Sequence, residues 1–151
     1  MASGAHNTIL IKGDPMRMEF TGADSSLYPG HLVKLGSGGT VTRQSNAGDF
    51  CAKIFAVEDD LQGKSKGDAY TTGYKVQCIA CRPGDEINAR IKSGESIAIG
   101  DYLTPHTDGT LKECAAEVES SAYALEDNFP IAMALEALTD SASDFCRVMI
   151  L

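Results

Sequence analysis

Residues 82–113 constrain the fold more than any other stretch of this sequence, because short alternating runs are separated there by turns that join a glycine to an acid. Ile87, Ala89 and Ile91 alternate with Asn88 and Arg90. A period of two bounded by glycine turns is typical of half-buried antiparallel strands. Ile97 and Ile99 repeat the spacing, and the turns are Gly84 with Asp85, Gly94 with Glu95, Gly100 with Asp101, and Asp108 with Gly109. None of these turns carries a nucleophile, a base or a set of metal ligands, so we interpret the stretch as scaffold.

The same pattern continues over most of the chain. We predict a hairpin at 31–44, a strand buried on both faces at 50–57, an alternating strand at 74–81, and strands at 131–135 and 145–151. On the third of these Tyr74, Val76 and Cys78 share a face, and on the fourth Ile131, Met133 and Leu135 do so. Residues 114–125 are compatible with a short helix or with a strand followed by a loop. Seven or eight strands and at most one short helix predict an all-β fold, a single small β-barrel or sandwich of short antiparallel strands.

The first twenty residues differ from the rest. A short apolar run at 8–12 and an alternating run at 16–20 are separated by Gly13, Asp14 and Pro15, which break any helix. Two interpretations stay open for this segment. It is an extended N-terminal arm (1–20) that pairs with a neighbour, in front of a β-barrel domain (21–151), or it is a strand of that same domain.

Charge and composition exclude several classes of partner. The formal net charge is -8 over 151 residues, and the Lys and Arg residues are scattered, which argues against binding to nucleic acid or to an anionic membrane. No apolar run reaches the length of a membrane span, and residues 1–7 lack the pattern of a signal peptide. The five cysteines are an odd number at irregular spacing, so we expect free thiols in a protein made in a reducing cytoplasm.

The pair Cys78 and Cys81 is the strongest candidate for a metal or redox site. A zinc site needs a second pair or histidines at matching spacing, and the sequence supplies neither. Residues three apart on a strand also face opposite sides, which separates the two thiols unless the strand ends between them. Buried cysteines that pack as small apolar side chains are the favoured interpretation.

Two histidine–aspartate combinations, His106 with Asp108 and His31 near Asp24, could be fragments of an acid–base pair. They lie in turn-rich segments without a nucleophile elbow, and the glycine-rich residues 36–40 lack the lysine and helix of a phosphate-binding loop. We therefore predict no catalytic, cofactor-binding or metal-binding residue, no cofactor and no enzymatic activity.

The order of these turns and strands resembles that of a family of small structural proteins of tailed-phage heads, the capsid decoration or cement proteins. The resemblance extends from about Ile9 to Leu151, and each motif is a turn followed by a strand. The motifs lie at residues 28–35, 38–41, 55–59, 63, 68–70, 73–76, 82–86, 94–97, 100–103, 108–111 and 131–137, followed by the final strand.

The resemblance implies a bacteriophage decoration (cement) protein that binds the outer surface of the head and stabilises the shell. It implies the major capsid protein as partner, self-association as a homo-oligomer with a trimer favoured over a dimer, and a place on the virion exterior after synthesis in the host bacterial cytoplasm. It carries over no catalytic residues. We also expect deletion of the residues before Phe20 to weaken attachment to heads.

Two other functions stay open. Residues 94–97 and 100–103 also resemble segments of β-clip ligand-binding modules, although a concave cluster with Arg or aromatic anchors is missing. A trimeric nucleotide hydrolase on a related barrel is a third hypothesis, but the Asp and Ser motifs of those enzymes are not found.

Overall fold

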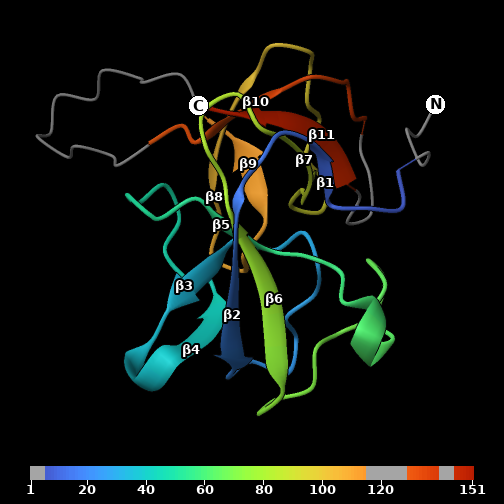
Figure 1. The fold of residues 1–151 in the computed structure, drawn as a ribbon. Helices are drawn as coiled ribbons and strands as arrows, with labels where there is room; N and C mark the ends of the chain where they lie inside the picture. The colour runs from blue at the N-terminus through green and yellow to red at the C-terminus, as the bar shows by residue number, and fades with distance from the viewer. Residues whose placement is uncertain (1–5, 115–128, 140–144) are drawn as a thin grey trace, which may run out of the picture.

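The computed structural model describes residues 6–114, 129–139 and 145–151, and these residues form two sheets stacked end to end (Figure 1). The six-stranded sheet has the order β1-β7-β11-β10-β8-β9, and the five-stranded sheet has the order β3-β4-β2-β6-β5. In the described residues the remaining regular elements are two 3₁₀ turns, and no barrel is closed. The prediction of an all-β fold is therefore confirmed.

The strands are short, as the spacing of the turns requires. Those of the six-stranded sheet are β1 (Leu10–Lys12), β7 (Glu86–Arg90), β8 (Tyr102–Pro105), β9 (Leu111–Glu113), β10 (Ala132–Ala134) and β11 (Phe145–Ile150). Those of the five-stranded sheet are β2 (Met16–Gly22), β3 (Val33–Leu35), β4 (Thr40–Arg43), β5 (Ile54–Ala56) and β6 (Lys75–Ala80). The 3₁₀ turns are η1 (Ser37–Gly39) and η2 (Asp60–Gln62). The predicted helix or strand at 114–125 lies, apart from Cys114, outside the described residues.

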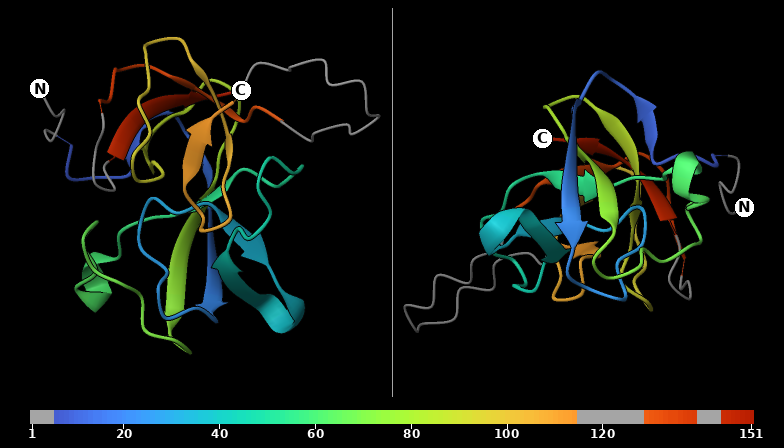
Figure 2. Two further views of the ribbon diagram at one scale, coloured as in Figure 1. Left: turned by 180° about the vertical axis from the view of Figure 1, so that it is seen from behind. Right: turned by 60° about the horizontal axis from the view of Figure 1, so that its bottom comes forward.

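The first strands of the chain are paired within the molecule. Leu10 of β1 lies opposite Ile87 of β7, and β2 pairs antiparallel with β6 from Met16 opposite Ala80 to Thr21 opposite Lys75. The chain thus enters the six-stranded sheet, builds the whole five-stranded sheet and returns to the first (Figure 2). The division into an arm (1–20) and a domain (21–151) stays a prediction, because a segment paired on one edge can still reach a neighbour through the other.

The predicted hairpin at 31–44 is confirmed, with Val33 opposite Arg43, but its place in the sheet differs from an all-antiparallel arrangement. Strand β4 lies parallel to the end of β2, where Thr21 is opposite Thr40 and Gly22 is opposite Val41. The segment between β2 and β3 crosses over before the hairpin begins, and the returning strand therefore runs in the same direction as β2. The alternation of apolar and polar residues along each strand does not indicate a crossover of this kind.

Two groups of buried apolar side chains hold the sheets. The first lies on the inner face of the six-stranded sheet and also receives Phe55 of β5 and Ile79 of β6, so it joins the two sheets. The second fills the curved five-stranded sheet, with Tyr70 and Val76 among its buried members. Each fully buried large apolar side chain contributes about 1.5–3 kcal/mol relative to an exposed one.

Several predicted faces are wrong in detail. Ile99 is 70% exposed because residues 98–101 form a turn, where the period of two does not apply. On β10 the small residues Ala132 and Ala134 are buried and Met133 faces outward, whereas Ile131, which was expected to share a face with Met133, is buried. Tyr74 is 62% exposed because β6 begins one residue later.

The turn at Tyr28, Pro29, Gly30 and His31 connects the two sheets. The amide of Gly30 donates to the carbonyl of Ala56 in the five-stranded sheet (2.8 Å), and its carbonyl accepts from the amide of Arg90 in the six-stranded sheet (3.1 Å). Gly30 has a φ of +90°, which favours glycine. The turn therefore fixes the position of one sheet against the other.

The side chain of Arg90 strengthens this junction. Its guanidinium carbon lies 4.5 Å from the ring centroid of Phe145 and 5.0 Å from that of Tyr28. Its Nε donates to the carbonyl of Pro29 (2.8 Å) and its Nη2 to the carbonyl of Lys66 (2.6 Å). Burial lowers the pKa of Arg90. The cation is therefore held by aromatic rings and carbonyl oxygens, and this arrangement stabilises the junction between the two sheets.

Candidate functional site

The outer face of the six-stranded sheet presents a continuous row of side chains across five strands. Met133 of β10 lies opposite both Tyr102 of β8 and Met149 of β11, and Met149 lies opposite Glu86 of β7. Glu86 is in turn opposite Lys12 of β1. We call these five residues the outer-face row. Neighbouring strands in register bring such side chains within contact distance of one another.

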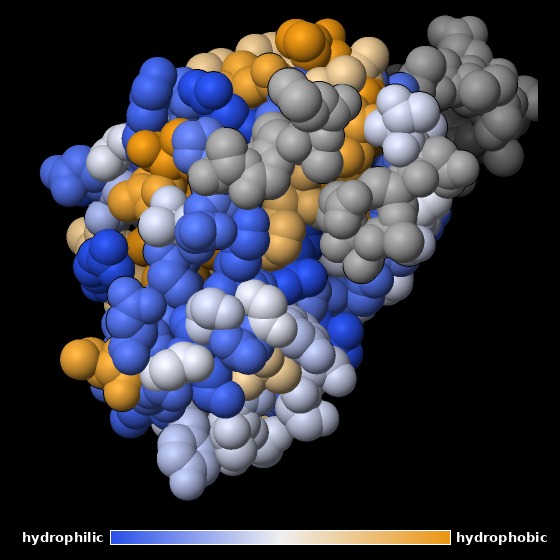
Figure 3. Space-filling model, turned by 90° about the vertical axis from the view of Figure 1, so that its right-hand side faces the viewer, coloured by the Kyte–Doolittle hydropathy of each residue, from blue (hydrophilic) through white to orange (hydrophobic). Residues whose placement is uncertain are grey.

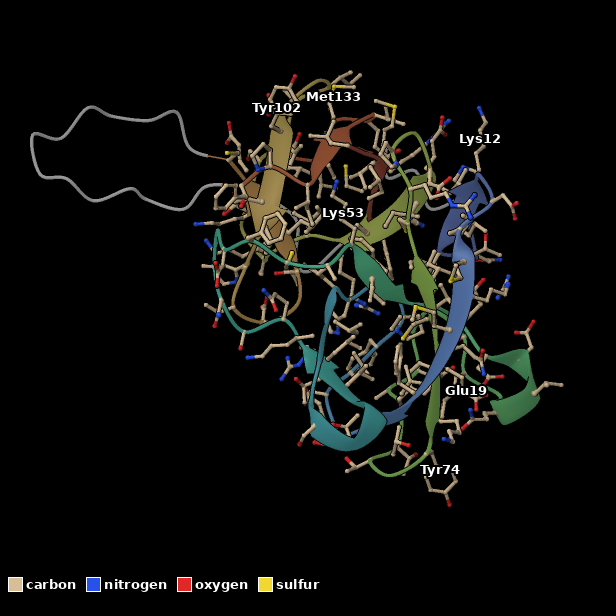
Figure 4. The ribbon with its side chains drawn as sticks, turned by 60° about the vertical axis from the view of Figure 1, so that its left-hand side comes forward. Lys12, Glu19, Lys53, Tyr74, Tyr102 and Met133 are labelled. Carbon is tan, nitrogen blue, oxygen red and sulfur yellow. The ribbon has the colours of Figure 1, made fainter. Side chains whose placement is uncertain are left out.

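One half of the outer-face row is apolar. Tyr102 is 53% exposed, Met133 and Met149 are half-buried, and Ile99 lies beside them in the turn whose Gly100 donates to the carbonyl of Ala134. Tyr102 and Met133 project together from the end of the molecule far from Tyr74 (Figure 4). Apolar residues gather at this end of the space-filling view, whereas the opposite end is mostly polar (Figure 3). Contiguous apolar side chains with a polar border are characteristic of interaction sites.

The other half of the outer-face row is charged and internally paired. The Nε of Arg147 donates to Glu86 Oε2 (3.0 Å), and Lys12 Nζ lies 3.8 Å from Glu86 Oε1. The hydrogen bond from Arg147 lowers the pKa of Glu86. These groups form a polar border beside the apolar half, and ion pairs that remain accessible to solvent add little to stability.

The two cysteines singled out by their spacing are not brought together. Cys78 is buried in the group of side chains that fills the five-stranded sheet, while Cys81 packs against the group beneath the six-stranded sheet. Burial raises the pKa of each thiol to about 12. Over the ranges that the structure describes, no group of three or more His, Cys, Asp or Glu residues could hold a metal ion. The geometry agrees with packing as small apolar side chains.

His106 and Asp108 do meet, with 3.1 Å between Nδ1 and Oδ1. The same carboxylate oxygen accepts from the amide and the hydroxyl of Thr110. Burial opposes ionisation of Asp108, but the hydrogen bonds from Thr110 and His106 outweigh it and lower its pKa to about 2. A carboxylate that accepts this many hydrogen bonds from neighbouring residues stabilises the turn in which it lies.

His31 and Asp24 form hydrogen bonds with different residues. Asp24 Oδ2 accepts from Arg43 Nε at 2.7 Å, whereas His31 is buried and its Nδ1 accepts from the amide of Tyr28 at 3.1 Å. Burial, with a contribution from the charges of Arg90 and Arg43, lowers the pKa of His31 to about 3. His31 therefore stays neutral and acts as an acceptor inside the turn that joins the sheets.

The outer-face row was not among the residues proposed from the sequence. Met133 was expected only to share a face with Ile131 and Leu135, and the row joins strands that lie far apart in the chain. The signal that could have found it is the small–large alternation of residues 132–134, since two buried alanines leave the methionine on the outside.

The fold places the chain in the class of two-sheet all-β proteins. No family model matches the sequence, and no curated protein matches it at a significant level. A solved structure with a similar fold is the N base of the head fiber gp8.5 of bacteriophage phi29, with a TM-score of 0.53 and 15% sequence identity. The alignment covers 90% of this chain and 95% of that one. Within the described residues, no helix has the length and apolar character needed to cross a membrane.

Proposed function

We propose that this chain is a non-enzymatic structural protein of a bacteriophage head, which decorates the outside of the shell and stabilises it. The observation that carries the proposal is the likeness of fold to the phi29 head-fiber base, because it extends over nearly the whole of both chains. A protein that binds the assembled shell but not its separated parts stabilises the shell by mass action, without any reactive group.

The apolar half of the outer-face row is the surface proposed to contact the major capsid protein. It is formed by strands of the sheet and is therefore rigid, and an exposed tyrosine beside methionines is a composition enriched in protein interfaces. The net charge of -8 suits an outward position better than contact with packaged DNA. Self-association as a homo-oligomer is part of the proposal, with the resemblance described above as its support.

Co-sedimentation tests the proposal directly. Purified protein is mixed with expanded heads that lack it, the heads are pelleted, and the bound protein is measured against added protein. We expect saturable binding and heads that resist heat or chelation better when decorated. Heads that bind none of the protein, or bound protein that leaves head stability unchanged, would contradict the proposal.

Truncation is a poor test of attachment in this fold. Deletion of the residues before Phe20 removes β1 and most of β2, and with them one edge of the six-stranded sheet and a central strand of the five-stranded sheet. Loss of head binding in such a protein would report unfolding. Point substitutions on the outer-face row avoid this difficulty.

A further inference from the structure

One edge of β2 is open over residues 16–20. Strand β6 pairs with β2 along its whole length on one side, from Met16 to Thr21. On the other side β4 reaches β2 only at Thr21 and Gly22. Within the described ranges no other strand pairs with this side. An open edge exposes unpaired main-chain groups that can accept another strand.

The main-chain hydrogen bonds at the end of β2 show which residues face the open side. The amide of Gly22 donates to Tyr74 beside β6 (2.9 Å), and the amide of Ala23 donates to Val41 of β4 (2.9 Å). The N–H and C=O groups of one residue point to the same side of a strand, and this side alternates from residue to residue. Arg17 and Glu19 therefore direct their main-chain groups to the open side.

The side chains of Arg17 and Glu19 are exposed, opposite in charge and without an ionic partner in the part of the chain that the structure describes. Glu19 accepts a hydrogen bond from Gln77 Nε2 (2.7 Å), and it projects from the outer face of the five-stranded sheet (Figure 4). Two residues apart on one strand, both charges lie on the same face.

We propose that this edge binds the same edge of a second copy, antiparallel about a twofold axis that passes beside Met18. Arg17 of each copy then lies opposite Glu19 of the other. Both are residues whose main-chain groups face the edge, so each pair exchanges the two N–H···O bonds of a hydrogen-bonded antiparallel pair. Opposite charges directly across an antiparallel pair are stabilising.

The two neighbouring registers are unfavourable. One places Arg17 opposite Arg17 of the second copy and requires Pro15, which has no N–H, to pair with Glu19. The other places Glu19 opposite Glu19 and requires Thr21, which already pairs with Thr40 of β4. Like charges directly opposite each other are destabilising, so charge and the position of β4 select the same register.

The pairing also covers apolar surface. Met16 is 58% exposed, and in this register it lies opposite Phe20 of the second copy. The contact is short, well below the area of roughly 1,200 Å² that stable complexes bury, so a weak dimer is expected in dilute solution. Copies held close together on a shell would associate more readily, because their effective concentration is higher.

Sedimentation velocity over a wide range of protein concentration is the primary experiment, with charge reversal as the probe. Arg17→Glu and Glu19→Arg each place like charges across the axis, and we expect each to weaken the dimer at least ~tenfold. The double variant Arg17→Glu/Glu19→Arg restores opposite pairs and should recover wild-type association. Lys34→Glu, an exposed charge reversal on β3, is the control and should change nothing.

Cross-linking tests the register independently. Met18 lies opposite Met18 in a pair that is not hydrogen-bonded, with Cα atoms about 4.5 Å apart, so Met18→Cys should form a disulfide-linked dimer on mild oxidation. Arg17→Cys should not, because the two copies of residue 17 are offset along the strands beyond the ~7 Å that a disulfide can span. Wild-type protein, with its five thiols, is oxidised in parallel as a background.

The proposal is overturned if neither single charge reversal changes the sedimenting mass, or if the double variant fails to restore the wild-type mass. It is also overturned if the protein forms a trimer whose stability none of the three variants changes. It is also overturned if the reversals reduce binding to heads and leave self-association intact, since the edge would then take a capsid segment. Head binding is measured separately, so a failed dimer leaves the proposed function standing, and the reverse also holds.

Discussion

Gly30 lies so close to Phe145 that a Cβ atom added to the glycine would sit 2.8 Å from Cε1 of the ring. Phe145 begins the last described strand, and Gly30 lies in the turn that joins the two sheets. The contact leaves room for glycine alone and shows how tightly the sheets are fixed at this junction.

The first prediction concerns Gly30→Ala. The substitution adds a methyl group against Phe145 and Arg90 at a φ of +90°, so we expect a loss of about 2–4 kcal/mol in the free energy of unfolding. Gly38→Ala is the matched control, since its φ is +72° but nothing lies within 4 Å of the added atom. It should cost about 1 kcal/mol. Urea denaturation measures both, and equal losses would contradict the close contact.

A second prediction follows from the position of Arg90 between two rings. Arg90→Met keeps the length of the side chain but leaves the carbonyls of Pro29 and Lys66 without their donors. We expect the free energy of unfolding to fall by about 2–3 kcal/mol. Arg82→Met, at an exposed arginine, should change it by less than about 0.5 kcal/mol. If Arg90→Met leaves the free energy of unfolding unchanged, the junction does not depend on the cation.

The pKa of His31 makes stability depend on pH. The pKa is lowered from 6.5 in the unfolded chain to about 3 in the folded one. Above 6.5 both states are neutral and the stability is complete. As the pH falls from 6.5 towards 3, only the unfolded chain binds a proton, and the fold loses up to about 1.4 kcal/mol for each pH unit.

His31→Asn tests this dependence, because its side-chain oxygen can still accept from the amide of Tyr28. Between about pH 7 and pH 4.5 the wild type should lose about 2–3 kcal/mol more than this variant. His6→Asn, a histidine outside the junction, should follow the wild type. Parallel pH profiles for wild type and His31→Asn would show that burial of His31 does not drive the loss.

Attachment to heads is expected to depend on the apolar half of the outer-face row. Met133→Lys places a charge in its centre and should weaken co-sedimentation at least ~tenfold without unfolding the protein. Leu61→Lys makes the same chemical change at a fully exposed residue of η2 and should bind as the wild type does. Equal binding by both variants would place the contact elsewhere on the molecule.

Thiol reactivity gives a fifth prediction. Burial raises the pKa of Cys78 and of Cys81 to about 12, so neither forms much thiolate at neutral pH. In native buffer both should react with iodoacetamide far more slowly than in urea, as measured by mass spectrometry of their peptides. Rapid joint protection by added zinc would instead indicate a shared metal site.

The sequence predicted the strands well and their faces less well. Glycine turns set limits of β6 and β7, because a positive φ at Gly73 or Gly84 is a local requirement of the backbone. The parallel contact of β2 with β4, and the return of β1 to the sheet of β7, are decided by packing between distant segments. No local pattern records them.

The outer-face row was missed for the same reason. Its members come from five strands and become neighbours only through the register of the sheet. Met133 shows most clearly what the sequence could not predict, since its hydrophobicity indicates burial but the structure places it on the outer face of the sheet. The packing of Cys78 and Cys81 as small apolar side chains could be predicted, although β6 ends at Ala80 and the two thiols are separated because they face different groups of buried side chains.

The strand order carries a consequence for biosynthesis. Strands β2 to β6 are contiguous in sequence, so the five-stranded sheet has all its parts once residue 80 has left the ribosome. The six-stranded sheet does not, because β11 lies between β7 and β10 and pairs with both of them. Until that strand emerges, β7 and β10 each expose an unpaired strand edge. A nascent chain of this protein therefore exposes strand edges that can mispair until β11 has left the ribosome.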